Sequence, residues 1–410
     1  MADFGAADLD TFRAEVRAWL ESNYPAELRD PDARTDPEAV WGGRAFEGDK
    51  GSADPQIVWM RRVAEQGWTA PTWPKAYGGA GLTAAQARII DQEIARGRYR
   101  PPLLSFGIWM LGPVLLEYAN EEQKQEHLPK IVRGEIRWCQ GYSEPGAGSD
   151  LASLATKCED KGDHWQIDGQ KVWTSYADKA DWCFCLVRTD PSKKHEGISF
   201  VLIDMRLPGV ETRPIKLISG ESPFCETFFT GVKIPKGNLV GKINGGWEIA
   251  KRLLQYERQN ISAGFGEGGG VGGGSAADLG EIAKTYVGIE DGALADLELR
   301  RRITESKMNA QALRQTIGRI AAESRATNGP SAATSIIKYA AAEFAKARAE
   351  LVVEAMGAQG LGWDGEGFDP AELAAVHGWL RTKANSIEGG TSEVNLNVIS
   401  KRVLGLPDPK

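Results

Sequence analysis

The chain has 410 residues, of which 42% are hydrophobic and 26% are charged, and its formal net charge is −7. This length predicts two or three packed units, and the composition is typical of a globular protein. Acidic residues outnumber basic ones by 56 to 49, which argues against nucleic acid as the main partner because phosphate binding needs a basic face. The sequence contains no apolar run near the roughly 20 residues that a membrane span needs.

The cysteines and the first residues indicate the cellular setting. Five cysteines are scattered without paired spacing and accompany only four histidines, so we expect no structural zinc site, no other metal site and no disulfide framework. The acidic start, residues 1–9, does not resemble a secretory signal. We therefore expect a reducing, cytoplasmic location.

The first third of the chain predicts helices. Apolar residues recur at three- and four-residue steps from Leu9 to Leu20, which places them on one helical face. Further helices are expected at residues 55–65, 83–96 and 121–131. Residues 67–79 combine tryptophans with glycine and proline, which indicates a loop anchored by buried aromatic rings.

The middle third predicts strands. Short β-rich runs are expected at residues 164–167, 181–187, 198–203 and 228–234, separated by turn residues. The pair Asp168-Gly169 is typical of a hairpin turn. Strands at this spacing, with no helix between them, predict an antiparallel barrel or sandwich.

The last third predicts helices again, at residues 247–262, 294–326, 332–356 and 370–386. The stretch 264–275 is so rich in glycine that we expect a mobile surface loop. It is not a phosphate-binding loop in our interpretation, because no strand precedes it and no Lys-Ser or Lys-Thr follows. The plan is a helical domain at residues 1–137, a β domain at 138–244 and a helical domain at 245–410.

Two segments of the β domain are candidates for binding a ligand. Residues 140–150 contain Pro145 and two glycines that let the backbone approach a flat or anionic group; an ordinary turn into the β domain is equally compatible. In residues 171–175, period-two alternation places Trp173 and Ser175 on one face of a strand. A stacking ring beside a hydroxyl suits an aromatic cofactor, although tryptophans in strands are usually part of the core.

Two helical segments are further candidates. Gly389-Gly390 interrupts a helix that Thr391 and Glu393 restart, which predicts a capping arrangement whose free backbone N–H groups favour an oxygen ligand; a simple helix–turn–helix is the alternative. Glu257 lies in an otherwise apolar helix. It is either a solvated ion-pair partner of Arg258 or a general base whose pKa is raised by burial.

These segments, in this order, resemble the acyl-CoA dehydrogenase family over nearly the whole chain. The most specific matches are Ser143-Glu144-Pro145-Gly146-Ala147-Gly148-Ser149-Asp150, Gly169-Gln170-Lys171-Val172-Trp173-Thr174-Ser175 and Gly390-Thr391-Ser392-Glu393. The resemblance implies an N-terminal helical domain, a middle antiparallel β-barrel and a C-terminal four-helix bundle, with FAD held between the barrel and the bundle. It also implies a homo-oligomer, a dimer or a tetramer.

The resemblance implies a role for each matching residue. Those that would contact the flavin ring are Tyr142, Ser143, Trp173 and Ser175. Thr391 and Glu393 would meet the ribityl or diphosphate part of FAD. Ser149 would face the pantetheine of an acyl-CoA thioester, and Arg258 would lie near its CoA portion.

The implied reaction is FAD-dependent dehydrogenation of an acyl-CoA to the trans-2-enoyl-CoA, with electrons passed to an electron-transfer flavoprotein. A glutamate removes the α-proton while hydride leaves the β-carbon for the flavin. Many members place this glutamate in a Glu-Gly-Thr tripeptide, where this chain has Glu388-Gly389-Gly390-Thr391, so the usual position falls on Gly389. Other members carry it in a Glu-Arg pair on a bundle helix, which Glu257-Arg258 matches. We therefore predict Glu257 as the base, with Glu388 as the alternative and Gly389 contributing its amide to the thioester oxygen.

One departure from the family leaves alternatives open. The segment after Gly264 lacks the usual arginine pattern for the adenine side of FAD, and Arg300, Arg301 or Arg302 would replace it. A flavin oxidase or monooxygenase of the same fold, and a non-catalytic acyl-CoA-binding subunit, are the alternative functions. Sequence spacing does not identify the acyl group.

Overall fold

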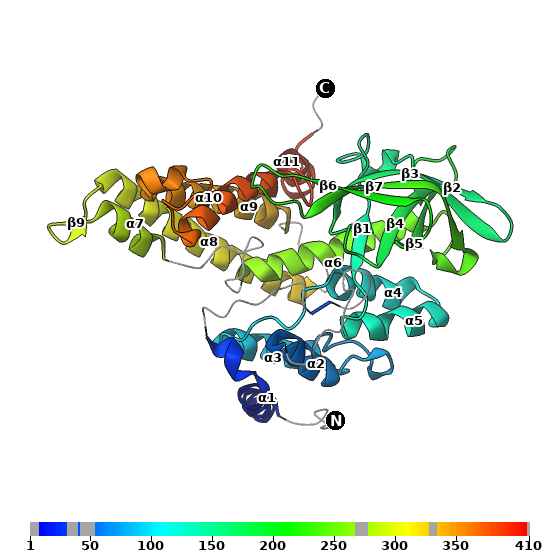
Figure 1. Cartoon of the computed structure of the whole chain (residues 1–410), viewed down its shortest axis with the longest axis horizontal. Coiled ribbons are helices and arrows are strands. Elements are labelled where there is room, and N and C mark those ends of the chain that lie inside the picture. The colour runs from blue at the N-terminus through cyan, green and yellow to red at the C-terminus, as the bar shows by residue number, and fades with distance from the viewer. Residues whose placement is uncertain (1–7, 31–39, 42–53, 267–277, 328–333, 408–410) are drawn as a thin grey trace. The chain divides into compact units, whose positions relative to one another are not determined.

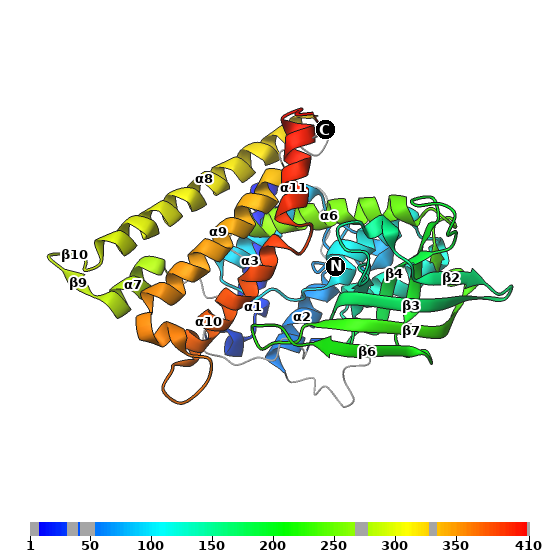
Figure 2. The same ribbon diagram turned by 90° about the horizontal axis from the view of Figure 1, so that it is seen from above.

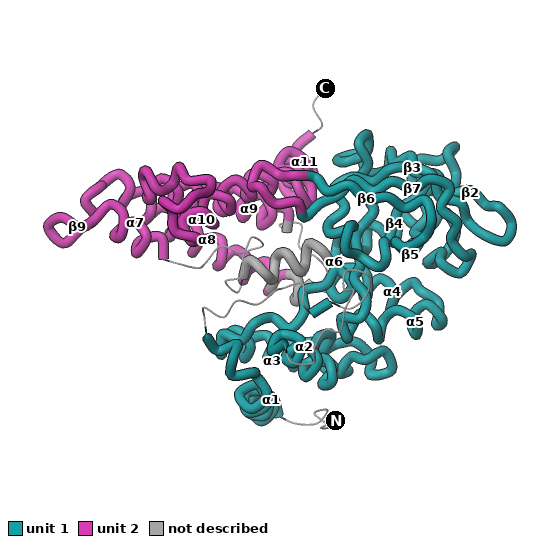
Figure 3. Tube along the Cα trace, viewed as in Figure 1, with its two compact units in different colours: residues 1–215, 223–256 teal, residues 216–222, 257–410 magenta. Residues whose placement is uncertain are grey.

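The computed structural model describes residues 8–30, 40–41, 54–266, 278–327 and 334–407 (Figure 1). The chain divides into two compact units (Figure 3). Unit 1 consists of residues 1–215 and 223–256, and unit 2 consists of residues 216–222 and 257–410. These units are not the three predicted domains, whose boundaries stay a prediction.

Unit 1 begins with α-helices, and the sequence predicts all of them except the one at residues 112–118. They are α1 (Leu9–Asn23), α2 (Pro55–Glu65), α3 (Ala84–Arg96), α4 (Gly112–Tyr118) and α5 (Glu121–Val132). A capping box at Thr83 starts α3, because its hydroxyl and the Gln86 side chain satisfy two backbone N–H groups. A π-helical turn, Gly107–Leu111, precedes α4 and is not apparent from the sequence.

A buried carboxylate joins α1 to α3. Glu93 is 1% exposed and accepts hydrogen bonds from Arg13 at 3.1 Å, Arg17 at 2.9 Å and Arg96 at 2.6 Å. The bond from Arg17, followed by those from Arg96 and Arg13, outweighs burial and lowers the pKa of Glu93 to about 2. The carboxylate is therefore fully paired, which is the condition for burying a charge without a large cost.

The middle of unit 1 is a mixed β-sheet. Its strands are β1 (Trp138–Gly141), β2 (Lys157–Asp160), β3 (His164–Ser175), β4 (Trp182–Arg188), β5 (Ile198–Asp204), β6 (Val210–Ile215), β7 (Phe224–Pro235) and β8 (Leu239–Val240). The strand order is β6-β7-β3-β2-β4-β5-β8, with β1 paired to β4, and Figure 2 shows β6, β7 and β3 side by side.

The predicted closed antiparallel barrel is not confirmed. Strand β1 pairs with β4 in parallel, and so does β2 at one residue, whereas the other pairs of this sheet are antiparallel. Among the described residues, no pairing joins the end strands β6 and β8. The sequence pattern reports which strands exist but not whether the outermost ones meet, because that depends on contacts far apart in the chain.

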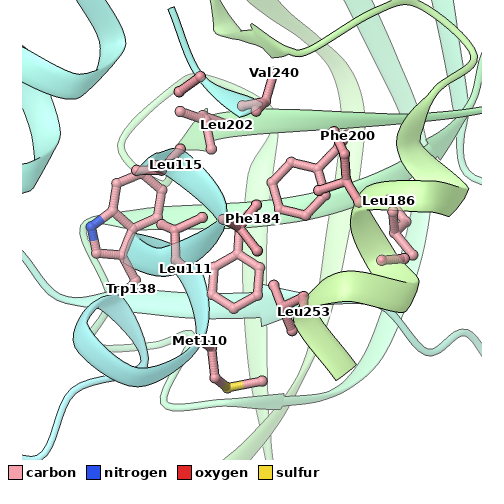
Figure 4. Close-up of a cluster of buried hydrophobic side chains, with 14 of the residues drawn as sticks. Met110, Leu111, Leu115, Trp138, Phe184, Leu186, Phe200, Leu202, Val240 and Leu253 are labelled. Carbon is pink, nitrogen blue, oxygen red and sulfur yellow. The ribbon is translucent and has the colours of Figure 1, made fainter. Parts of the chain in front are cut away.

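Strands β4 and β5 are buried on both faces. Residues of alternating position belong to two different hydrophobic clusters, so period-two geometry sends neighbours to opposite sides. One cluster packs the sheet against α4, α5 and helix α6 (Gly246–Gly266), as Figure 4 shows for Phe184, Phe200 and Leu253. The other cluster lies between this part of the sheet and β3 with β7.

All five cysteines are buried as free thiols. All five belong to the second cluster: four lie on β1, β2 and β4, and Cys225 lies on β7. Burial raises the pKa of Cys158 to about 12 and that of Cys225 to about 11. Thiols in such surroundings behave as small apolar side chains rather than as nucleophiles.

The predicted hairpin turn at Asp168-Gly169 is wrong. Both residues lie inside β3, and the turn that joins β2 to β3 comes earlier, around Gly162 with its φ of +91°. A Cβ on Gly169 would lie 2.6 Å from the Thr156 hydroxyl and 2.7 Å from its Cα. Glycine is therefore required at position 169 by the close approach of another chain segment, which gives the same sequence signal as a turn.

Unit 2 is helical. It contains α7 (Leu279–Val287), a short β9 (Ile289–Glu290) and β10 (Ala293–Leu294) hairpin, α8 (Leu297–Thr327), α9 (Thr334–Ala355), α10 (Pro370–Thr382) and α11 (Ser392–Val398). Helices α8 and α9 run alongside each other (Figure 2), and α7, α8 and α9 share one hydrophobic cluster. Most of the predicted glycine-rich loop, from residue 267 on, lies outside the described residues.

Within the part of the chain that the structure describes, every helix is too short or too polar to cross a membrane.

The Gly169→Ala substitution tests the corrected role of this glycine. We expect the added methyl group to collide with Thr156 and to lower the free energy of unfolding by about 1–3 kcal/mol, measured by urea denaturation. The control is Gly237→Ala, where a new Cβ meets nothing within 4 Å, so a change below about 0.5 kcal/mol is expected. Equal stability of the two variants would contradict the close-approach explanation.

Candidate active site

The loop after β1 is a tight turn with an open surface. Glu144 and Ala147 exchange two backbone hydrogen bonds of 3.0 Å, which closes the turn around Pro145. A Cβ added at Gly146 or Gly148 would meet nothing within 4 Å. These glycines therefore leave free space beside the backbone, as an approaching ligand would need.

A buried ion pair fixes this loop to β3. The Lys171 side chain has no exposed surface, and its Nζ lies 2.8 Å from Glu144 Oε1 and 3.1 Å from the Tyr142 carbonyl oxygen. The next residue, Val172, donates its backbone N–H to the Ser143 carbonyl at 2.9 Å. The loop and the middle of β3 are thus one connected structure.

Strand β3 bulges immediately after Lys171. Its pairing with β7 shifts register between Lys171 and Thr174, and Trp173 has a φ of +59°. Such a conformation costs a non-glycine residue about 1–3 kcal/mol and is concentrated at functional sites. The bulge turns the Trp173 ring outward, where it is 55% exposed and meets Phe224 edge-on at 6.3 Å. Bulges re-aim side chains in this way.

The other candidates in unit 1 differ in how accessible they are. Ser143 and Ser175 are half-buried and Ser149 is exposed. Tyr142 is 5% exposed, with its ring edge-on to Phe184 at 6.1 Å. The Tyr142 ring is therefore part of the hydrophobic core, so its predicted contact with a flavin would come from its backbone.

Helix α6 is fastened to α4 just before the predicted base. Arg252 donates to Glu117 at 2.8 Å and the Tyr256 hydroxyl donates to the same carboxylate oxygen at 3.1 Å. Burial works to raise the pKa of Glu117, but these hydrogen bonds outweigh it and lower it. Helix α6 continues through Glu257 and Arg258, whose side chains lie outside the described residues.

The chain tail forms the predicted helix restart in unit 2. Gly389 and Gly390 have φ values of +61° and +93°, and Thr391 caps α11 by accepting the Val394 N–H at 3.1 Å. Hydrogen bonds from its own backbone N–H and from Thr391 lower the pKa of Glu393. The Val394 N–H, one of the backbone donors expected to be free for a ligand, is therefore already bound by the Thr391 hydroxyl.

The alternative base already has a partner. Glu388 accepts from Arg381 at 2.8 Å and 3.4 Å across its two carboxylate oxygens. Both side chains are only partly exposed, at 38% for Glu388 and 23% for Arg381. Arg381 therefore holds the Glu388 carboxylate at the position where the sequence predicts the alternative base.

The three arginines at the start of α8 have different surroundings. Arg301 is paired with Glu298 and Glu305, and Arg302 with Glu354 at 2.5 Å, whereas Arg300 is exposed. Arg302 also lines a cavity of about 290 Å³ between α8 and α9. Which of the three would replace the adenine-side arginine of the family stays an open prediction.

The sequence analysis missed the residues that support the candidates. Lys171, Glu144 and Arg381 were not assigned any role, although two of them lie inside the quoted motifs. The signal in the sequence was Lys171 itself, which follows the apolar Trp165 and Ile167 at alternating positions and therefore points to the same buried face of the strand. Such a lysine requires a buried acidic partner.

Comparison with known proteins assigns the family. The sequence models of the acyl-CoA dehydrogenase N-terminal, middle and C-terminal domains match residues 7–135, 139–232 and 244–404. The chain belongs to the acyl-CoA dehydrogenase family. It is accordingly an oxidoreductase.

Individual relatives agree with this assignment. Acyl-CoA dehydrogenase IpdE1 of Mycobacterium tuberculosis is 35% identical over 402 residues, 98% of each chain. Acyl-CoA dehydrogenase FadE34 of the same organism is 38% identical over 84% of this chain, which spans 45% of that longer relative. The solved structure of the Tcur3481-Tcur3483 steroid ACAD is 28% identical and covers all of both chains with a TM-score of 0.75.

The cofactor of this family is FAD, and the residues of unit 1 fit its flavin ring. The exposed indole of Trp173 offers a flat face, and flat rings stack on such faces. The free space beside Gly146 and Gly148 admits a ring close to the backbone. The half-buried hydroxyls of Ser143 and Ser175 can donate or accept hydrogen bonds at ring atoms.

The Trp173→Gly substitution separates strain from binding. Glycine relieves the positive φ but adds freedom to the unfolded chain, so the apoprotein should keep its unfolding free energy within about 1 kcal/mol. Loss of the stacking face should weaken FAD binding roughly tenfold, measured by titrating the apoprotein and following flavin fluorescence. Trp173→Phe, which keeps an aromatic face, is the control; unchanged FAD affinity in Trp173→Gly would show that the indole does not contact the ring.

Proposed function

We propose that this enzyme oxidises an acyl-CoA thioester to the trans-2-enoyl-CoA with FAD and passes the electrons to an electron-transfer flavoprotein. Family membership along the full length supports the reaction class. The observation that supports it most directly is the strained, outward-facing Trp173 beside the loop at residues 142–148. A site that stores backbone strain to present a flat ring suits a cofactor with a flat ring.

Glu257 is the general base in this proposal. FAD, when bound, accepts the hydride from the β-carbon, and the protein has to take the α-proton at a fixed position. Helix α6 carries Glu257 directly after the turn that Glu117 fastens through Tyr256. The ion pair between Glu388 and Arg381 supports the choice of Glu257.

The remaining site residues serve binding. The Gly389 amide donates to the thioester oxygen, where donors stabilise the charge that develops as the α-proton leaves; its φ of +61° suits glycine. Ser149 and Arg258 bind the CoA part. The residues that bind FAD in this proposal are Tyr142, Ser143, Trp173, Ser175, Thr391 and Glu393.

The acyl group is bulky in our proposal. The Tcur3481-Tcur3483 protein, which is 28% identical over all of this chain, is a steroid ACAD, and a base on a bundle helix is compatible with branched, long or bulky groups. We therefore assign the enzyme to acyl-CoAs whose acyl group carries a ring system. The same proposal includes three domains, with boundaries at 137/138 and 244/245. It also includes assembly as a homo-oligomer, either a dimer or a tetramer.

Anaerobic titration with a panel of acyl-CoAs tests the reaction and the substrate class together. We expect ring-bearing acyl-CoAs to bleach the flavin absorbance near 450 nm ~tenfold more effectively than short straight-chain ones. Reoxidation should be slow in air and fast with an artificial electron acceptor. Rapid oxygen consumption would favour an oxidase or monooxygenase instead, and a colourless protein that no acyl-CoA bleaches would favour a non-catalytic subunit.

Glutamine substitutions test the base. Glu257→Gln should retain FAD and bind the acyl-CoA but reduce the rate of flavin reduction by roughly 10²–10⁴-fold or more, because it removes a positioned proton acceptor. The matched control is Glu388→Gln, which should stay active. Stopped-flow absorbance under anaerobic conditions measures both rates. If Glu388→Gln is the inactive variant and Glu257→Gln is active, the base is Glu388.

A further inference from the structure

Lys171 and Glu144 form a deeply buried ion pair in unit 1. Lys171 has no exposed surface and Glu144 is 8% exposed, with 2.8 Å between Nζ and Oε1. Glu144 also accepts the backbone N–H groups of Ala155 at 2.6 Å and Thr156 at 2.9 Å. One carboxylate therefore connects the loop after β1, the segment before β2 and the middle of β3.

The charge state of the pair is set by its own contacts. Burial works to raise the pKa of Glu144, but the ammonium group of Lys171 and the hydrogen bonds to the carboxylate outweigh it and lower that pKa. The Glu144 carboxyl group and the Lys171 side chain therefore compensate each other in the interior. Removal of one partner would leave an unpaired charge in an apolar interior.

The pair controls the backbone around the ring-binding residues. Lys171 Nζ holds the Tyr142 carbonyl at 3.1 Å, and the adjacent Val172 N–H holds the Ser143 carbonyl at 2.9 Å. The bulge follows at once and turns Trp173 outward. Inward anchoring of residue 171 is what allows an extra residue to re-aim residue 173, because period-two alternation would otherwise put both on the buried face.

Stability alone does not account for an ion pair at this place. Well-packed apolar side chains of similar volume often replace a buried pair without loss of stability, and apolar thiols line the neighbouring positions of β4. A charged pair differs from apolar packing because its hydrogen bonds depend on orientation, so each partner has to meet specific donors or acceptors. The contacts here go to the backbone of the loop and of the segment before β2.

We propose that Lys171 and Glu144 are positioning residues of the cofactor site, which hold the Tyr142–Ser143 backbone and the bulge at Trp173 in the geometry that accepts the flavin ring. The pair touches neither substrate nor cofactor in this proposal, and acts through the residues it fixes. The inference rests on the proposed function, because it assumes that Trp173 and the loop meet the flavin.

The test replaces both partners together. The double variant Lys171→Met/Glu144→Leu removes both charges and keeps apolar volume, so no unpaired charge is left behind. Three quantities are measured on the full chain: urea denaturation of the apoprotein, the dissociation constant of FAD from fluorescence titration, and the visible circular dichroism of bound flavin. The matched control is Lys194→Met, which removes an exposed lysine paired with Asp150 at 2.9 Å.

We expect the double variant to unfold cooperatively near the wild-type urea midpoint, to bind FAD at least about tenfold more weakly, and to show an altered visible dichroism. Lys194→Met should match wild type in all three. A double variant with wild-type FAD affinity and dichroism would overturn the proposal, and so would one that no longer folds, because the pair would then serve the fold itself. Failure of the proposed function is distinguishable, since wild-type protein would then bind FAD without being bleached by acyl-CoAs.

Discussion

The position of the candidate site depends on a lysine that water does not reach. An ammonium group in an apolar interior requires a compensating charge and directed acceptors, and the Glu144 carboxylate with the Tyr142 carbonyl supplies them to Lys171. Because the carboxylate also takes the N–H groups of residues 155 and 156, three chain segments that are distant in sequence are bound to one point. The loop, the bulge and the exposed indole follow from that constraint.

The site and its support have opposite physical characters. The support consists of buried side chains in close contact, such as the stacked Phe184 and Phe200 of β4 and β5. The unusual features lie in the candidate site: a tryptophan at positive φ, a register shift between β3 and β7, and glycines beside open space. Close packing around the inward-pointing residues of β3, such as the fully buried Lys171, can hold such strain because it leaves the backbone no relaxed alternative.

Much of the fold is predictable from local pattern, and what escapes prediction is non-local. Helix α2 and the cap at Thr83 follow from spacing and capping chemistry within a few residues. The turn predicted at Gly169 was wrong because a turn and a close approach to Thr156 both select glycine. The motif residues of the site were recognisable, yet the partner of Lys171 and the bulge at Trp173 depend on chain segments brought together only by folding.

The five buried thiols can be used to measure local opening of the β-sheet. Because all five thiols are buried, and burial raises the pKa of Cys158 to about 12 and that of Cys225 to about 11, an alkylating reagent dissolved in water reacts only after a strand detaches. Cysteines on β1, β2, β4 and β7 sample different parts of the sheet. The alkylation rate of each cysteine, measured by mass spectrometry, would therefore show the order in which the strands open, and no probe has to be introduced into the chain.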